Sequence, residues 1–292
     1  MRTIFRDPNG QLRNGWWILI FLLFVLATRV VHAPLVAALK ALDVPEAWRD
    51  PLPVLFVLLA TWACTRLRRE PLSSIGLELD RRWWRQLGAG FGLGMAALAL
   101  AALLMMAVGG VQFELQPDRS ASLLAWGLYG FVFAAALEEL LFRGFLFQRL
   151  LDGIGVWGAQ LLLAGLFALA HWGNPGMEGA TRIWATVDIG LASMMLGLAY
   201  LRTRSLALPL GLHLGWNWMQ GSVLGFGVSG HAAAGWWQPV FADAPAWMTG
   251  GDFGPEAGAF GLLVDLVMLV LLWRWKGRAP APAPAMVPVP AS

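Results

Sequence analysis

Long stretches with few or no charged residues recur along the whole chain, and they constrain its fold more than any other feature. Eight such stretches cover residues 15–38, 51–67, 87–110, 121–142, 155–173, 183–201, 205–222 and 257–273. The hydrocarbon core of a bilayer is about 30 Å thick and needs about 20 helical residues to cross. The pattern therefore predicts an all-α, polytopic integral membrane helix bundle of about eight transmembrane helices.

The composition agrees with a membrane protein. Of 292 residues, 58% are hydrophobic and only 13% are charged, and the mean hydropathy is +0.61. A soluble domain carries a charge on about 25% of its residues. The single cysteine, Cys64, lies in an apolar stretch, so the sequence predicts neither an intramolecular disulfide nor a thiolate metal cluster.

The basic residues predict the orientation in the membrane. The ends and loops on one side of the predicted bundle hold Arg2, Arg6, Arg13, Arg66, Arg68, Arg69, Arg81, Arg82, Arg85, Arg143, Arg149, Arg202, Arg204, Arg274, Lys276 and Arg278. The other side holds Lys40, Arg49, Arg119 and Arg182, which leaves Arg29 within the first stretch. This bias predicts a multi-pass protein of the bacterial cytoplasmic membrane with both termini cytoplasmic. Because the arginines are scattered over loops, membrane lipids are the expected partners and nucleic acid is not.

Two adjacent carboxylates, Glu138 and Glu139, end the fourth apolar stretch. Residues four apart on a helix are neighbours, so Glu139 and Arg143 can form an ion pair. Glu138 is rotated by about 100° from Glu139 and has no such partner in its own helix. Ionisable groups within a membrane usually mark a functional site. A helix that ends near residue 138 and leaves both acids in water is the structural alternative.

Two later stretches each carry one histidine. Phe167 precedes His171 by one helical turn and could hold its ring, while His213 and Asn217 share one face of an apolar helix. Counted at about 1.5 Å per residue, Glu138 and both histidines can meet in the cytoplasmic half or near the middle of the bilayer. The sequence thus predicts one catalytic centre built from three helices.

These residues resemble a known family, the CAAX prenyl protease and bacteriocin-processing (CPBP) group of intramembrane proteases, also called abortive-infection or CAAX protease-like proteins. The resemblance covers about residues 120–220. Its three motifs are matched by Glu138 and Glu139 with Arg143, by Phe167 with His171, and by His213 with Asn217. The family implies hydrolysis of a peptide bond at the membrane, with Glu139 and Arg143 fixing the backbone and the local charge beside the reacting groups.

The resemblance also implies roles for the remaining catalytic candidates. Glu138 would take a proton from water, and His171 would hold that water. His213 and Asn217 would stabilise the oxyanion that develops on the attacked carbonyl. The expected partner is a membrane-associated or lipidated peptide or protein substrate, and no residue pattern indicates prenyl recognition or an oligomeric state.

Metal dependence stays open in the sequence. His171, His213 and Glu138 could form a three-ligand zinc site with one open position. The same residues could instead act as a glutamate protease without metal. The metal-free mechanism is preferred because Asn217, on the face of His213, is a better oxyanion donor than a zinc ligand.

The predicted organisation has three parts: a cytoplasmic N-terminal segment over 1–14, a membrane helix bundle over 15–277 with the protease core at about 120–220, and a disordered Ala/Pro-rich tail over 278–292. The loop over 223–256 could cover the outer mouth of the bundle. Two other functions remain as alternatives: a membrane binding or immunity protein that uses the same cavity, and a proton-coupled transporter. The transporter is suggested by Asp188 and Asp265, which lie in different helices without an obvious partner.

Overall fold

The computed structural model describes residues 2–6 and 10–277. The tail predicted to be disordered, 278–292, lies outside the described residues. The longer helices are α2 (Asn14–Ala41), α4 (Pro51–Leu67), α5 (Arg81–Ala107), α6 (Ala121–Arg143), α7 (Phe145–Ala170), α8 (Gly179–Thr203), α9 (Ala207–Asn217) and α11 (Ala259–Arg274). Short helices are α1 (Arg2–Phe5), α3 (Glu46–Arg49), α10 (Ala246–Thr249), and single turns over Leu72–Ile75, Gly251–Phe253 and Pro255–Ala257.

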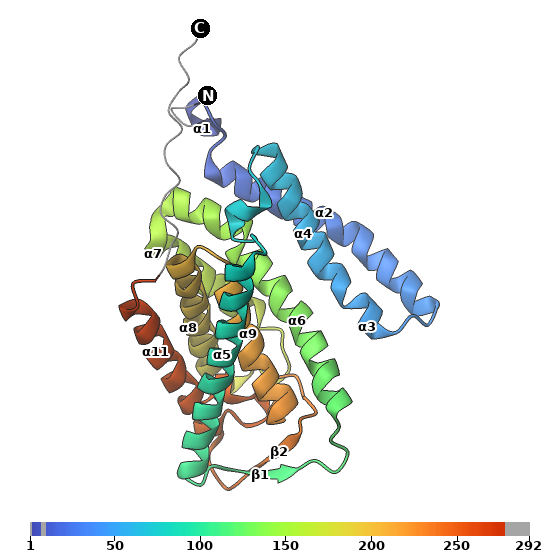
Figure 1. Cartoon of the computed structure of the whole chain (residues 1–292), viewed down its shortest axis with the longest axis vertical. Coiled ribbons are helices and arrows are strands. Elements are labelled where there is room, and N and C mark those ends of the chain that lie inside the picture. Colours follow the sequence, from blue (N-terminus) through green and yellow to red (C-terminus); the bar gives the residue numbers. More distant parts are fainter. Residues whose placement is uncertain (1, 7–9, 278–292) are drawn as a thin grey trace.

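The predicted helix bundle is confirmed. Each of the eight apolar stretches coincides with one of the eight longer helices (Figure 1). Five helical segments are long and apolar enough to cross a membrane: Asn14–Ala41, Glu46–Leu67, Arg81–Ala107, Ala121–Ala170 and Gly179–Thr203. Helices α9 and α11 are shorter, with 11 and 16 residues, and α9 continues into a π-helical turn over Trp218–Val223.

Two short strands, which the sequence analysis did not predict, close one end of the bundle. Strands β1 (Val111–Leu115) and β2 (Trp237–Phe241) pair antiparallel, at the end opposite α1 (Figure 1). Strand β2 lies in the long loop that was expected to cover the outer mouth. The pairing ties this loop to the segment after α5. The same loop contributes Val228, Ser229, His231, Ala232 and Ala233 to the wall of a cavity between the helices.

Helices α5 and α9 pack closely because both carry glycines at the contact. A Cβ added to Gly94 of α5 would overlap the carbonyl oxygen of Leu212, and one added to Gly215 of α9 would overlap the carbonyl oxygen of Phe91. Small residues allow helix backbones to approach in a membrane, where the hydrophobic effect does not drive helices together. Close packing against α5 fixes the position of α9, which carries His213.

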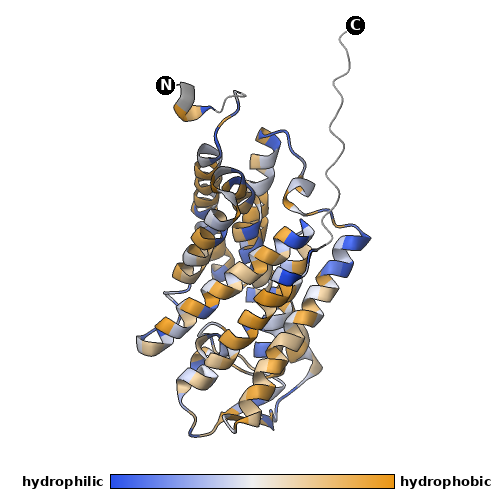
Figure 2. Ribbon diagram, turned by 90° about the vertical axis from the view of Figure 1, so that its left-hand side faces the viewer, coloured by the Kyte–Doolittle hydropathy of each residue, from blue (hydrophilic) through white to orange (hydrophobic). Residues whose placement is uncertain are grey.

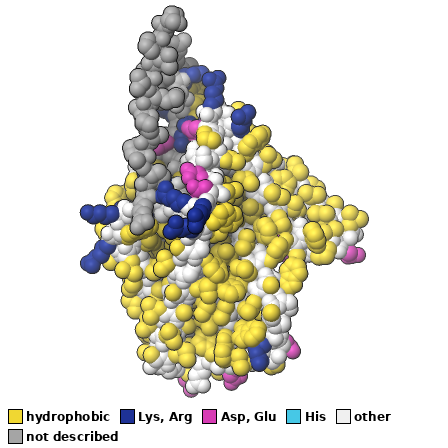
Figure 3. Space-filling model, in the orientation of Figure 1, with side chains coloured by type: hydrophobic (Ala, Val, Ile, Leu, Met, Phe, Trp, Pro, Cys, Tyr) yellow, Lys and Arg dark blue, Asp and Glu magenta, His cyan; other side chains and the backbone are white. Residues whose placement is uncertain are grey.

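Helices α2 and α4 form a hairpin that diverges from α6 (Figure 1). Helix α2 contacts α4 and α7, but most of its surface is open, and residues such as Leu26 and Val30 are 64% and 74% exposed. Hydrophobic residues dominate the long helices (Figure 2) and cover the middle of the face shown in Figure 3. Such an apolar outer surface suits contact with lipid.

Candidate active site

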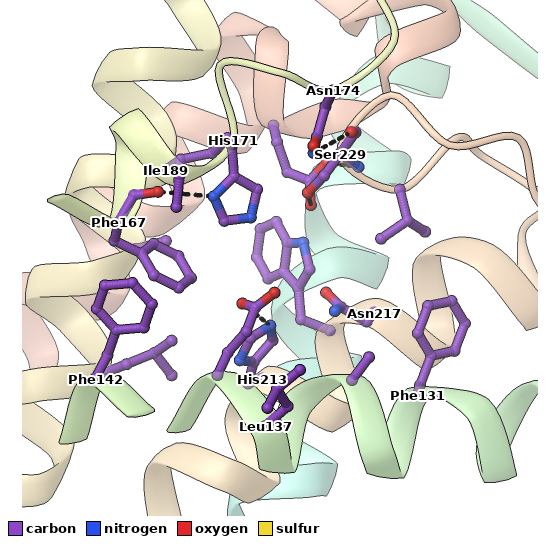
Figure 4. A pocket seen from close by; sticks show the side chains of 18 of the residues that line it. Phe131, Leu137, Phe142, Phe167, His171, Asn174, Ile189, His213, Asn217 and Ser229 are labelled. Carbon is purple, nitrogen blue, oxygen red and sulfur yellow. Dashed lines mark hydrogen bonds and ion pairs between the residues drawn. The ribbon is translucent and has the colours of Figure 1, made fainter. Parts of the chain in front are cut away.

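A cavity of about 690 Å³ lies inside the bundle. Its wall combines side chains from α2, α6, α7, α8, α9 and α11 with the loop after α9 (Figure 4). Four of the six predicted site residues line it, namely Glu138, His171, His213 and Asn217. The other two, Glu139 and Arg143, are buried beside it.

The two adjacent glutamates occupy different environments. The side chain of Glu138 faces the cavity and is 31% exposed, whereas that of Glu139 is 1% exposed. Helix α6 continues to Arg143, so neither carboxylate lies beyond the helix end. Consecutive residues of a helix point about 100° apart, so Glu138 can reach a ligand in the cavity while Glu139 is enclosed by protein.

Glu139 binds both Arg143 on its own helix and His213 on α9. Its Oε1 accepts a hydrogen bond from Nη1 of Arg143 at 3.0 Å and another from Nδ1 of His213 at 2.9 Å. Arg143 also donates from Nη2 to the backbone oxygen and the hydroxyl of Ser193, at 3.0 and 2.9 Å. This network connects α8, α6 and α9, and it satisfies charges that would be costly when buried alone.

His213 is oriented by this network toward the other glutamate. Because a carboxylate only accepts, Nδ1 of His213 carries the proton in its bond to Glu139. Its Nε2 lies 3.7 Å from Oε2 of Glu138, too far for a good direct hydrogen bond. A water or a substrate oxygen bound between such groups would contact both.

His171 follows the last residue of α7 rather than lying within the helix. Its Nδ1 donates to the carbonyl oxygen of Phe167 at 2.7 Å, and this carbonyl is one of those left free at the helix end. Since Nδ1 carries this proton, Nε2 of the neutral ring is an acceptor, and Figure 4 shows the ring inside the pocket.

The ring of Phe167 packs against the Arg143 guanidinium and the His171 imidazole. Its ring centroid is 4.8 Å from the His171 ring, 4.8 Å from the guanidinium carbon of Arg143 and 4.9 Å from the ring of Phe142. The His213 ring lies further away, at 6.5 Å. The aromatic face thus contacts Arg143 as a cation–π partner and restricts the His171 ring.

Asn217 is the last residue of α9, and the π-helical turn follows it directly. Its side chain lines the cavity one helical turn from His213. None of the residues that the structure describes forms a hydrogen bond with its amide. Irregular turns of this kind are frequent at functional sites, and the amide is left able to donate to a ligand.

Acidic residues that the sequence analysis left without a partner also reach this cavity. Asp188 and Asp265 line it, are 1% and 2% exposed, and each has one carboxylate oxygen with no partner among the described residues. They lie near each other and near Glu256. Glu256, which precedes α11, is bound by Gln220 and Ser229, while burial raises the pKa of its carboxyl. Only the tertiary fold brings these three acids together.

The zinc site considered from the sequence requires three ligating side chains close together. Among the described residues, no three His, Cys, Asp or Glu side chains are grouped closely enough to hold a metal ion. His213 donates from Nδ1 to Glu139 and His171 donates from Nδ1 to a backbone carbonyl, so neither hydrogen bond by itself prevents Nε2 from binding a metal. Among the described residues, the three candidate ligands of the predicted zinc site are therefore not grouped, and metal dependence stays a prediction.

Residues 120–219 match the model of a family described as type II CAAX prenyl endopeptidase Rce1-like. The chain is also 29% identical over 174 residues to an uncharacterized protein of Bacillus subtilis (strain 168) named YyaK, a match covering 54% of each chain. The chain thus spans about half the length of this curated relative. No solved structure matches the chain significantly.

The family match and the apolar helices together make this an integral membrane protein. All three motifs lie inside the matched segment, as the sequence resemblance predicted. Over residues 120–219, the chain is thus similar to the Rce1-like family of type II CAAX prenyl endopeptidases.

Proposed function

We propose that the protein is an intramembrane endopeptidase that hydrolyses a peptide bond of a membrane-associated or lipidated substrate, with water activated by Glu138. One observation carries this proposal: Glu138 faces the cavity 3.7 Å from Nε2 of His213, while Glu139 is bound by both His213 and Arg143. One carboxylate is free to react, and the adjacent one positions its partner. The match of residues 120–219 to a peptidase family supports the same reaction.

The proposed reaction begins with a water held between the Glu138 carboxylate and Nε2 of His171. Glu138 takes one proton of this water, and the resulting hydroxide attacks the carbonyl carbon of the peptide bond. The protonated Glu138 then gives this proton to the leaving nitrogen as the C–N bond breaks. Each proton and electron pair is accounted for by the peptide, the water and one side chain.

The negative charge on the attacked oxygen requires donors, and we assign this role to His213 and Asn217. Asn217 donates from its amide. Because Nδ1–H of His213 is bound to Glu139, Nε2 can donate when the ring is protonated on both nitrogens, and Glu139 would balance that charge. Donors that are already in position stabilise such an oxyanion without reorganisation.

We further propose that the reaction proceeds without a bound metal. Two observations support this proposal: the described residues contain no group of three ligating side chains, and the Asn217 amide lines the cavity beside His213 as a possible donor. The proposed location is the bacterial cytoplasmic membrane with both termini cytoplasmic, on the basis of the Arg and Lys distribution.

The test compares Glu138→Gln with the wild-type protein. Membrane peptides are identified by mass spectrometry in cells that carry either form, and a peptide whose cleavage depends on the wild type is then digested by purified protein. The proposal is supported if the wild-type protein cleaves the peptide and the correctly inserted Glu138→Gln variant does not. A variant that retains the cellular effect of the wild type would indicate a non-proteolytic binding protein instead.

A further inference from the structure

An arginine lies near the middle of helix α2. Arg29 is 15 residues from Asn14 and 12 residues from Ala41, the two ends of this helix. At about 1.5 Å per residue, these separations correspond to roughly 22 and 18 Å along the helix axis. Its neighbours Leu26, Val30 and Val31 are exposed apolar residues. Arg29 is itself exposed, so a charged side chain lies in a segment whose other exposed residues are apolar.

Arg29 has no ion-pair or hydrogen-bond partner in the part of the chain that the structure describes. Other arginines near the bundle are paired: Arg143 with Glu139, and Arg202 with the backbone of α11. A charged side chain at the centre of a bilayer is costly and almost always faces an interior surface, a cavity or a partner. The absence of a protein partner points to a ligand.

The position of Arg29 identifies where this ligand would lie. Arg29 of α2 and Glu138 of α6 line the same cavity. The wall of this cavity also carries apolar side chains of α6, including Leu137 and Leu141. Negatively charged Glu138 lies on this wall as well, but no ion pair connects it to Arg29. The cation thus belongs to the binding surface around the proposed catalytic water.

We propose that Arg29 binds the C-terminal carboxylate of the peptide substrate and so sets the direction in which the peptide enters the cavity. The planar guanidinium matches a carboxylate with two parallel hydrogen bonds. A lipid phosphate offers similar chemistry, but it lies at the surface of a hydrocarbon core about 30 Å thick, whereas Arg29 is at mid-helix. The carboxylate of an inserted peptide can reach this depth. The inference rests on the proposed peptidase function.

The test measures binding rather than cleavage, so that it remains informative if the chain hydrolyses nothing. The full chain with Glu138→Gln is purified in a detergent free of phospholipid. A fluorescein-labelled apolar hexapeptide is titrated in two forms, with a free C-terminus and with a C-terminal amide. We expect the free acid to bind about tenfold more tightly, as a charge-assisted hydrogen bond warrants.

Three variants in the same background identify the residue responsible. Arg29→Gln should reduce the acid-to-amide affinity ratio to about one, and Arg29→Lys should keep part of it. Val30→Ala is the matched control, because Val30 is the adjacent residue, is 74% exposed and does not line the cavity, and it should leave the ratio unchanged. Thermal unfolding of each variant checks that the fold is intact.

Equal affinity for acid and amide, or no binding of either peptide, would overturn the proposal. If Arg29 instead binds a lipid phosphate, the preference for the free acid should disappear in nanodiscs that contain phosphatidylglycerol, and Arg29→Gln should weaken binding of that lipid. This result would also overturn the proposal. Failure of the peptidase function is a separate result, since wild-type protein would then cleave no peptide while the acid preference in binding persisted.

Discussion

Glu139 of α6 accepts a 2.9 Å hydrogen bond from His213 of α9, 74 residues further along the chain. The same carboxylate oxygen binds Arg143 at 3.0 Å. This double contact explains why two adjacent glutamates are useful in one site. Glu139 contacts the imidazole, and Glu138, rotated toward the cavity, is free for the water activation proposed above. In the proposed reaction, the pair thus divides positioning and chemistry between neighbouring residues.

The first prediction concerns the buried ion pair. Glu139→Gln should lower the free energy of unfolding by about 3–5 kcal/mol, because it leaves the Arg143 guanidinium buried without its counter-charge. Arg143→Met should be destabilising to a similar degree. The double variant Glu139→Gln with Arg143→Met should be little less stable than either single variant, since both charges are then gone. Chemical denaturation in detergent measures all three, and additive losses in the double variant would contradict the pairing.

The second prediction concerns metal. If water is held by Glu138 and His171, elemental analysis of active purified protein should find no stoichiometric zinc, and chelators should leave peptide cleavage unchanged. His171→Ala and His213→Ala should abolish cleavage without altering metal content. One equivalent of zinc that disappears in both histidine variants, with activity restored when zinc is returned, would establish a metal-dependent reaction.

Much of this architecture could be predicted from the sequence because apolar helices in a membrane leave a strong local pattern. The eight longer helices followed from the apolar stretches, although α7 begins ten residues before its stretch and α5 six residues before. The ion pair followed from the four-residue spacing of Glu139 and Arg143. The contact between Glu139 and His213 could not be derived in this way. It depends on the packing of α6 against α9, which no local spacing encodes.

The other features that the sequence did not predict also depend on contacts between distant segments. Asp188 and Asp265 lie on separate helices in the sequence, and only the packing of α8 against α11 places them on one cavity wall. His171 follows α7, because the chain turns there and its ring donates to the carbonyl oxygen of Phe167. Pairing of β1 with β2 joins segments more than one hundred residues apart. Local patterns therefore predict helices better than the contacts between them.

The third prediction concerns access to the cavity. Ala134 lines the cavity one turn before Glu138, while the adjacent Ala135 is completely buried. In a Cys64→Ser background, Ala134→Cys should react with a small charged thiol reagent added from the cytoplasmic side, and bound peptide should protect it. Ala135→Cys should stay unreactive. Labelling of Ala134→Cys only from the opposite side would contradict the proposed orientation.

The last prediction concerns the glycines that place His213. Gly94→Ala would put a Cβ against the Leu212 carbonyl oxygen, so α9 must move away from α5. We expect a loss of about 1–3 kcal/mol in stability and reduced cleavage, because the His213 side chain follows its helix. Gly92→Ala, on the open face of α5 with no atom within 4 Å of the added carbon, is the control and should stabilise the helix by up to about 1 kcal/mol. Equal effects of the two substitutions on unfolding and on peptide cleavage would show that close packing of α5 on α9 does not hold the site together.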